Sequence, residues 1–217
     1  MKQSVLVIGL GRFGSAAALE LMALGHEVLA VDMDEAVVNG IAPDVTHAAQ
    51  LDASDEKALR AVGAAEFSLA IVAISSATEA SIFATMALRN LGVNSIVAKA
   101  ATELHGAILG RVGADRVVYA ERETGQRVAH SLSIPNVIDY LDVAPRFGLA
   151  KIRPAAPWVG KTIKDIDLSG RLTVSLIALR RGSEVLVNPQ RDTVIAAKDE
   201  LIVLGLDDKL ERIASEG

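Results

Sequence analysis

The chain has 217 residues, a formal net charge of −5, 51% apolar residues and 3% aromatic residues. Its negative charge argues against a general nucleic-acid binder, and the absence of cysteine excludes disulfides and thiolate chemistry. No apolar run reaches the roughly 18 residues of a membrane helix, and residues 1–3 lead directly into a predicted strand without a signal-peptide pattern. We therefore expect a cytoplasmic protein.

A glycine-rich turn follows the first predicted strand, residues 4–8. Gly9, Gly11 and Gly14 form the pattern G-x-G-x-x-G, and a helix is predicted over residues 15–24. Gly9 allows a tight turn, Gly11 lets a phosphate approach the backbone, and Gly14 lets the helix pack closely on the strand. The helix N-terminus presents unpaired N–H groups to phosphates. The pattern predicts nucleotide binding, and the alternative is a Rossmann-like turn that has lost its ligand.

A second predicted strand, residues 26–31, ends at Asp32. An acid at this point of the pattern accepts hydrogen bonds from the ribose hydroxyls of a nucleotide. It would also repel a 2′-phosphate. The sequence therefore favours NAD- or ATP-type ligands over NADP.

Strands and helices continue to alternate through the first part of the chain. Further strands are predicted at residues 46–50, 68–74, 95–98 and 116–119, and helices at residues 35–41, 55–62, 78–91 and 103–112. Six strands that alternate with helices predict an α/β fold with a Rossmann-like, doubly wound parallel sheet. Ligands of such sheets bind outside the carboxyl ends of the strands. In this chain those ends carry Gly9, Asp32, Asp52, Ser75, Lys99 and Glu121.

Four charged or titratable residues near these strand ends each allow two interpretations. Arg12 could reach a phosphate of its own or a neighbouring chain, or it is a surface arginine. Lys99 could neutralise a phosphate or pair with an acid. Glu121 could bind a divalent cation beside the phosphates, or cap the next helix. His105 is either a ligand contact or a solvated helix residue, and no histidine pair has zinc-ligand spacing.

The periodicity changes after one more predicted helix, residues 121–132. Short strands at residues 148–153, 173–180, 184–187 and 200–206, with helices at residues 161–168 and 207–214, predict a smaller α+β domain. The predicted domains are residues 1–135, which bind nucleotide and include a crossover helix, and residues 136–217.

Residues just beyond this helix also show helical spacing. Ile134, Val137, Ile138 and Leu141 would form one apolar face. We expect the segment to residue 140 to cross to a second subunit. The alternative is that this face packs on its own domain.

Residues 7–14 (VIGLGRFG) and 25–32 (GHEVLAVD) resemble the cytosolic regulatory subunits of Ktr/Trk potassium transport systems. Residues 71–74, 97–100, 113–116, 129–132 and Glu121 are similar to the same family. Together they resemble an RCK N-terminal domain, and the region after residue 135 resembles a TrkA-C domain.

The resemblance implies a nucleotide-sensing regulatory subunit without enzyme activity, which gates a membrane potassium channel or transporter from the inner face of the cell membrane. It implies dimers that assemble into an octameric ring. It implies that ATP favours the conducting form and ADP the inactive form, and that NAD(H) binds some members. Cyclic di-AMP binds the C-terminal domain of several relatives, but residues 169–171 do not keep the basic residue in the expected register.

The resemblance also assigns roles by position. It implies a phosphate loop formed by Gly9, Gly11, Arg12, Phe13 and Gly14, and a ribose-binding acid at Asp32. It implies adenine contacts at Asp52, Ala53 and Ser54, and it aligns Ser75 with a position where glycine is common. It implies that Glu121 is a ligand for Mg or Ca. It implies that Arg12 contacts the terminal phosphate across a dimer. Asp52 departs from the asparagine that is frequent at its position.

The alternative function is an NAD-dependent oxidoreductase. A dehydrogenase needs an acid or base and a substrate pocket, usually supplied by a second domain. The predicted second domain contains no histidine. The sequence therefore favours a regulatory subunit over an enzyme.

Overall fold

The computed structural model describes residues 2–74, 77–133 and 136–214. Contacts between residues divide the chain into two units, Met1–Ala120 and Glu121–Gly217. The domain boundary that we expect after residue 135 lies next to residues 134 and 135, which are outside the described residues, and it stays a prediction. We describe each unit by itself.

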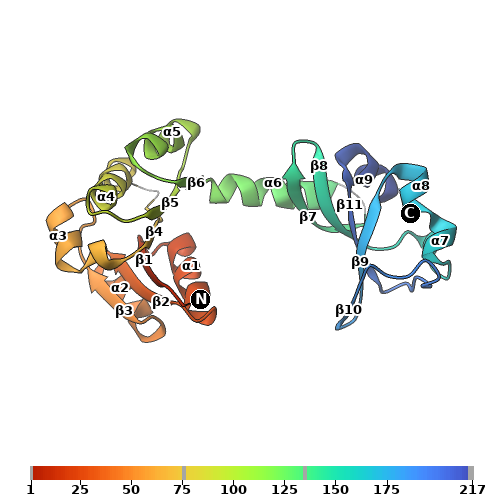
Figure 1. Cartoon of the computed structure of the whole chain (residues 1–217), viewed down its shortest axis with the longest axis horizontal. Helices are drawn as coiled ribbons and strands as arrows, with labels where there is room; N and C mark the ends of the chain where they lie inside the picture. The colour runs from red at the N-terminus through yellow and green to blue at the C-terminus, as the bar shows by residue number, and fades with distance from the viewer. Residues whose placement is uncertain (1, 75–76, 134–135, 215–217) are drawn as a thin grey trace. The chain divides into compact units, whose positions relative to one another are not determined.

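The first unit is built on a six-stranded sheet with the order β3-β2-β1-β4-β5-β6, and every neighbouring pair is parallel (Figure 1). The strands are β1 Ser4–Ile8, β2 Glu27–Asp32, β3 His47–Gln50, β4 Leu69–Val72, β5 Ser95–Lys99 and β6 Arg116–Val118. Each lies close to its predicted position. The strand order reverses at β1, which lies between β2 and β4 and thereby places the carboxyl ends of β1 and β4 side by side.

Helices follow the strands in alternation, which confirms the doubly wound α/β fold. They are α1 Arg12–Ala23, α2 Glu35–Ile41, α3 Glu56–Ala61, α4 Thr78–Asn90 and α5 Glu103–Val112, with short 3₁₀ turns at Ala42–Asp44 and Ala64–Glu66. Side chains cap three of them, because Asp34, Asp55 and Thr102 accept hydrogen bonds from the first turns of α2, α3 and α5.

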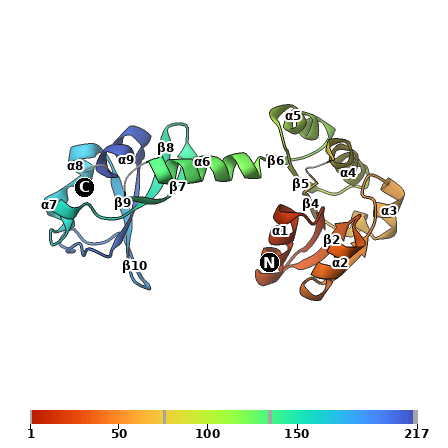
Figure 2. The same cartoon turned by 180° about the vertical axis from the view of Figure 1, so that it is seen from behind.

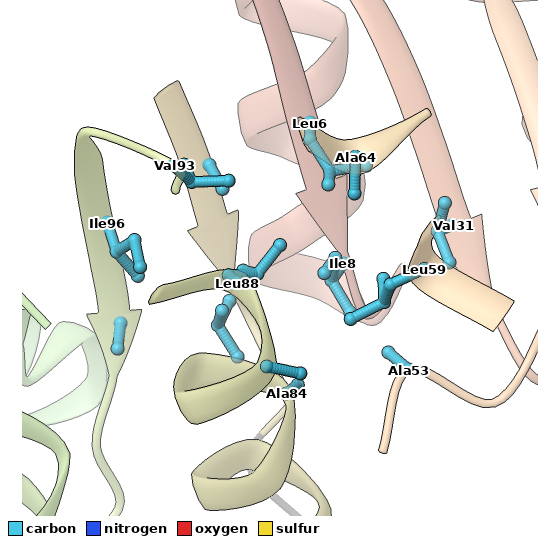
Figure 3. Close-up of a cluster of buried hydrophobic side chains, with 14 of the residues drawn as sticks. Leu6, Ile8, Val31, Ala53, Leu59, Ala64, Ala84, Leu88, Val93 and Ile96 are labelled. Carbon is cyan, nitrogen blue, oxygen red and sulfur yellow. The ribbon is translucent and has the colours of Figure 1, made fainter. Parts of the chain in front are cut away.

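Alternate residues of the central strands face opposite sides of the sheet. Leu6 and Ile8 of β1 pack with Leu59 of α3 and Leu88 of α4 in one cluster (Figure 3). Val5 and Val7 pack on the other side, in a separate cluster with α1 and α2. Both faces of the sheet are therefore covered, as the continuous apolar strands predict.

The second unit contains a five-stranded antiparallel sheet with the order β10-β9-β11-β8-β7. Its elements are α6 Ala120–Ser133, β7 Val137–Ala144, β8 Phe147–Ile152, a 3₁₀ turn Ala156–Trp158, α7 Ile163–Ile166, α8 Leu168–Leu172, β9 Ser175–Arg181, β10 Glu184–Val187, β11 Glu200–Leu206 and α9 Asp207–Ala214. Helix α9 lies beside the sheet (Figure 2), where it contacts β11 and β8. Its Leu210 and Ile213 join a core that contains Trp158. The expected α+β class is confirmed for this unit.

The helical face predicted beyond α6 is wrong for residues 137–141. These residues form β7, which pairs antiparallel with β8. The spacing of Val137, Ile138 and Leu141 fits a helix, but β7 and β8 form a hairpin whose turn contains Arg146 with φ 63°. Ladder hydrogen bonds and the burial of Tyr140 decide the structure, and neither leaves a periodic signal.

Two smaller differences occur at helix ends. The helix predicted over residues 161–168 is shorter in the structure, because α7 ends before Asp167, which adopts a left-handed conformation with φ 47° and is followed by α8. Helix α1 begins at Arg12, within the glycine pattern, rather than at Ser15. Among the helices of the described residues, none is both long and apolar enough to span a bilayer.

Candidate functional site

A cavity of about 180 Å³ opens at the carboxyl ends of β1, β2, β3 and β4. This is the crevice at which the strand order reverses, where open α/β sheets bind ligands. It is lined by Ile8, Gly9, Gly11, Val31, Asp32, Met33, Leu51, Asp52, Ala53, Ala73, Ile74, Ala77 and Ala80. Five predicted site residues, namely Gly9, Gly11, Asp32, Asp52 and Ala53, are therefore brought together in one lining.

The three glycines of the pattern differ in what requires them. Gly9 has φ 89°, and a Cβ there would come within 2.9 Å of the Ile74 backbone nitrogen. A Cβ on Gly14 would overlap the carbonyl oxygen of Gly9. Gly11 has φ −66°, which any residue adopts, and a Cβ there would meet nothing within 4 Å. The fold therefore requires Gly9 and Gly14, whereas Gly11 keeps the cavity wall bare.

Helix α1 presents its N-terminus beside this bare backbone. Gly11 is its N-cap residue, no side chain forms a cap hydrogen bond, and the first turn carries no acid. The Ser15 hydroxyl donates to the Leu10 carbonyl at 2.7 Å and so orders the turn before the helix. An uncapped helix N-terminus with its partial positive charge suits an anion such as a phosphate.

Asp32 ends β2 and is hydrogen-bonded through both carboxylate oxygens. Oδ2 accepts the Leu10 N–H at 2.6 Å, and Oδ1 accepts the Asp34 N–H at 2.9 Å. The residue therefore holds the glycine turn while it lines the cavity. Each carboxylate oxygen has a second lone pair, so ribose hydroxyls can still donate to it. The ribose role of Asp32 remains a prediction.

Asp52 follows β3 and forms a local turn with Ser54. Its Oδ1 accepts the Ser54 N–H at 2.9 Å and the Ser54 hydroxyl at 2.7 Å. The Ser54 hydroxyl and backbone lower the pKa of the Asp52 carboxyl, so the group is ionised at neutral pH. Asp52 lines the cavity as an acceptor, whereas the Ser54 side chain turns to Asp52 and is not part of the lining.

Three other predicted residues lie just outside the lining. Arg12 is exposed on the first turn of α1. Lys99 is 5% exposed, and its ammonium nitrogen lies 5.6 Å from the centre of the Phe13 ring. This cation–π contact links the end of β5 to the phosphate turn. The ligand contacts predicted for Arg12, Phe13 and Lys99 remain predictions.

Ser75 lies outside the described residues. Glu121 does not end a strand, because it belongs to the first turn of α6. Among the described residues, no group of three or more histidine or carboxylate side chains is placed to hold a metal ion. The divalent-cation site at Glu121 therefore remains a prediction that would need further ligands.

Several apolar lining residues were missed by sequence reasoning. Met33 follows Asp32 directly and is 72% exposed although it lines the cavity. Its backbone is fixed by the Gln50 side chain, which donates to the Met33 carbonyl at 3.1 Å. Leu51 and Ile74 also follow strand ends. Position after a strand was the only signal, because apolar side chains carry no chemical motif.

His105 is not the solvated helix residue that the sequence allowed. It is 3% exposed at the contact of α5 with α4, where its Nε2 lies 2.7 Å from the Ser81 hydroxyl oxygen. Burial lowers the pKa of the imidazole. The residue is absent from the cavity lining.

Residues 5–120 match the family model of the TrkA-N domain, and residues 149–216 match that of the TrkA-C domain. The chain is 39% identical to Ktr system potassium uptake protein C of Bacillus subtilis (strain 168) over 205 residues, which covers 94% of this chain and 93% of that protein. It is 33% identical to Ktr system potassium uptake protein A of the same organism over 211 residues, with coverage of 97% and 95%.

Solved structures with a similar fold include the GsuK RCK domain and the GsuK channel bound to NAD. Their TM-scores are 0.72 and 0.70, and their sequence identities are 19% and 20%. Both alignments cover 100% of this chain, which spans 48% and 40% of those chains. At this identity the likeness establishes the fold alone.

Proposed function

The chain belongs to the family of TrkA-N and TrkA-C domain proteins that includes the Ktr potassium uptake proteins, and from this premise we propose that it is a regulatory subunit which binds a nucleotide and gates a membrane potassium transporter. The proposal places it in the cytoplasm, at the inner face of the membrane through its partner. Dimers that assemble into an octameric ring belong to the same proposal.

One observation carries the nucleotide site. Gly11 has no structural need to be glycine, yet it lines a cavity beside the uncapped N-terminus of α1 and beside Asp32. A Cβ at this position would protrude where a phosphate has to approach the backbone. The bare wall is therefore best explained by a ligand.

The arrangement of the lining suggests how a nucleotide would lie. The N-terminus of α1 suits the phosphates, Asp32 the ribose, and Asp52 with Ala53 the base. The Asp52 carboxylate can accept a hydrogen bond from the exocyclic amino group of adenine. The charge of Asp32 opposes the 2′-phosphate of NADP, so we propose ATP and ADP as ligands, with NAD(H) as the next candidate.

Nucleotide control requires that ATP and ADP differ in their affinity for the two gating states. The two ligands share ribose and base, so only a group near the terminal phosphate can distinguish them. Arg12 is exposed on the first turn of α1, where it can reach a phosphate of its own or a neighbouring subunit. Glu121 with a divalent cation, Mg or Ca, and cyclic di-AMP at the second unit are further parts of this proposal.

Substitution of Gly11 tests the nucleotide site directly. We expect Gly11→Ala to weaken ATP and ADP binding about tenfold or more, because the added methyl group enters the cavity, while the melting temperature stays close to that of the wild type. Gly40→Ala is the matched control, since a Cβ at Gly40 also meets nothing within 4 Å but lies outside the lining. Equal nucleotide affinity of the two variants in calorimetry would exclude this cavity as the site.

The alternative of an NAD-dependent oxidoreductase predicts turnover. The only charged or titratable side chains in the described lining are Asp32 and Asp52, and both already accept backbone hydrogen bonds. The Ser54 hydroxyl and backbone lower the pKa of Asp52, whereas a general acid needs a raised one. The proposal of a non-enzymatic subunit is tested by incubating the protein with NADH and candidate carbonyl substrates, where oxidation above the buffer rate would contradict it.

A further inference from the structure

A buried polar contact joins α4 and α5 behind the cavity. Ser81 and Thr85 of α4 are 0% exposed, and His105 of α5 is 3% exposed. The same two helices contribute Ala84, Leu88 and Leu109 to a buried apolar cluster. A polar cluster in such an interface has to be fully hydrogen-bonded, because each unpaired group would cost its desolvation energy.

The hydrogen bonds of His105 define its protonation state. The Ala101 N–H donates to Nδ1 at 3.3 Å, so Nδ1 carries no proton. The neutral ring therefore carries its proton on Nε2, which donates to the Ser81 hydroxyl oxygen at 2.7 Å. Both ring nitrogens are satisfied only in this neutral form.

Ser81 connects His105 to the cavity wall. The Ser81 N–H donates to the Ala77 carbonyl at 3.1 Å, and Ala77 lines the cavity together with Ala80. Ala77 is the N-cap of α4, and its methyl side chain cannot accept the hydrogen bond that an N-cap side chain usually accepts. The hydrogen bond from His105 to Ser81 instead anchors the first turn of α4.

We propose that His105 is a positioning residue, which fixes the α4 wall of the nucleotide cavity only while its ring is neutral, so that nucleotide affinity falls on mild acidification. This inference rests on the proposed nucleotide site. It concerns a residue that does not touch the ligand and acts through Ser81.

Protonation breaks this arrangement for a geometric reason. In the imidazolium ring both nitrogens are donors, so Nδ1–H would face the Ala101 N–H. The ring would then have to turn away from Ala101, and its bond to Ser81 would be lost or weakened. Burial also disfavours the charged ring, so the buried position of the ring is favoured only while His105 is neutral.

The charged and titratable groups near His105 come from three elements. Lys99 of β5 directs its ammonium over the Phe13 ring, and Glu103 lies on the first turn of α5. Tyr119 follows β6, and its hydroxyl packs against Gly106, next to His105. Lys99, Glu103 and Tyr119 each take part in an interaction. Burial is the cause that lowers the pKa of the His105 imidazole.

The test measures ATP affinity by calorimetry from about pH 7.5 to about pH 5.5, on either side of the ordinary histidine pKa. We expect wild-type affinity to fall about two- to tenfold more than that of His105→Gln, because the fraction of competent protein falls as His105 gains a proton. Glutamine keeps a donor toward Ser81 but does not titrate. The titration of the ATP phosphates is common to both proteins and cancels in the comparison.

Two further variants keep the test decisive. His47→Gln removes an exposed histidine of β3 and should retain the wild-type pH profile. Ser81→Ala should weaken ATP binding a few-fold at about pH 7.5, which provides the test if His105→Gln does not fold. Wild type and His105→Gln with the same pH profile would overturn the inference while nucleotide binding at neutral pH still stands. If the wild-type protein binds no ATP at any pH, the proposed function itself is contradicted.

Discussion

The two units use their polar side chains in different ways. In the first unit, Asp32 and Asp52 lie at the carboxyl ends of parallel strands, where they line a cavity. In the second unit, polar side chains of the antiparallel strands pair with acids that lie just outside the strands. Arg181 binds Asp199 through two hydrogen bonds of 2.8 and 2.7 Å, and the Tyr140 hydroxyl donates to Asp207 at 2.5 Å.

This difference follows from strand direction. Parallel strands all end at the same edge of a sheet, so residues that follow them meet at one place and can surround a ligand. Antiparallel strands end alternately at opposite edges, and no edge collects them. The polar groups of the second unit therefore serve mainly the fold, whereas those of the first unit serve both the fold and a candidate site. The predictions below test that contrast from the largest expected effect to the smallest.

The largest effect is expected in the first unit. Gly14→Ala would place a Cβ against the Gly9 carbonyl, which forces the backbone to move and should cost about 3 kcal/mol or more of stability. Thermal unfolding followed by circular dichroism measures this loss. The only tryptophan, Trp158, is buried in the second unit, so its fluorescence should report little change. Wild-type thermal stability of the variant would contradict the packing role of Gly14.

The second unit should lose stability when the ion pair of its buried Asp199 is broken. The Asp199 side chain is 0% exposed, and Arg181 lowers the pKa of its carboxyl. Arg181→Ala leaves this carboxylate with the Ala196 N–H as its remaining partner, which should cost about 2–3 kcal/mol. We expect less than for a fully enclosed pair because Arg181 is half exposed. Trp158 fluorescence in urea measures the loss, and ATP affinity serves as the control that should not change.

Binding of ATP and ADP should depend on residues of the first unit. Asp32→Ala removes acceptors that both nucleotides share, so ATP and ADP affinity should fall alike by about 1.5–3 kcal/mol, or about ten- to a hundredfold. Arg12→Ala should instead reduce the difference between the affinities of the protein for ATP and for ADP. Arg111→Ala, an exposed arginine at the end of α5, is the control. If calorimetry gives Arg12→Ala the wild-type ATP-to-ADP ratio, the switching role of Arg12 is wrong.

The smallest effect concerns Tyr140 at high pH. Burial and the neighbouring Asp207 raise the pKa of its hydroxyl above the ordinary value. Above about pH 10 the unfolded chain therefore releases this proton while the folded chain keeps it, so stability falls as pH rises. Tyr140→Phe should show a shallower decline in urea unfolding at alkaline pH. Parallel pH profiles for the two proteins would exclude this contribution.

How much the sequence predicts depends on the kind of signal. Continuous apolar runs such as residues 4–8 place a buried parallel strand, and the glycine pattern with Asp32 locates the cavity. The helical face predicted after α6 is wrong because Val137, Ile138 and Leu141 fit a helical period as well as a strand, and only the pairing of β7 with β8 distinguishes the two. The role of Met33 and the burial of His105 depend on neighbours distant in the chain, which no local pattern records.

The double engagement of Asp32 has a consequence for evolution. Its carboxylate orders the glycine turn through Leu10, and in the proposed site the same charge would oppose a 2′-phosphate. A relative that changed its ligand preference by replacing this acid would lose the bond to the turn in the same step. Such a change would need a second substitution that restores an acceptor for the Leu10 N–H. If the proposed site is right, a single substitution of Asp32 would therefore alter the fold of the turn together with the nucleotide preference.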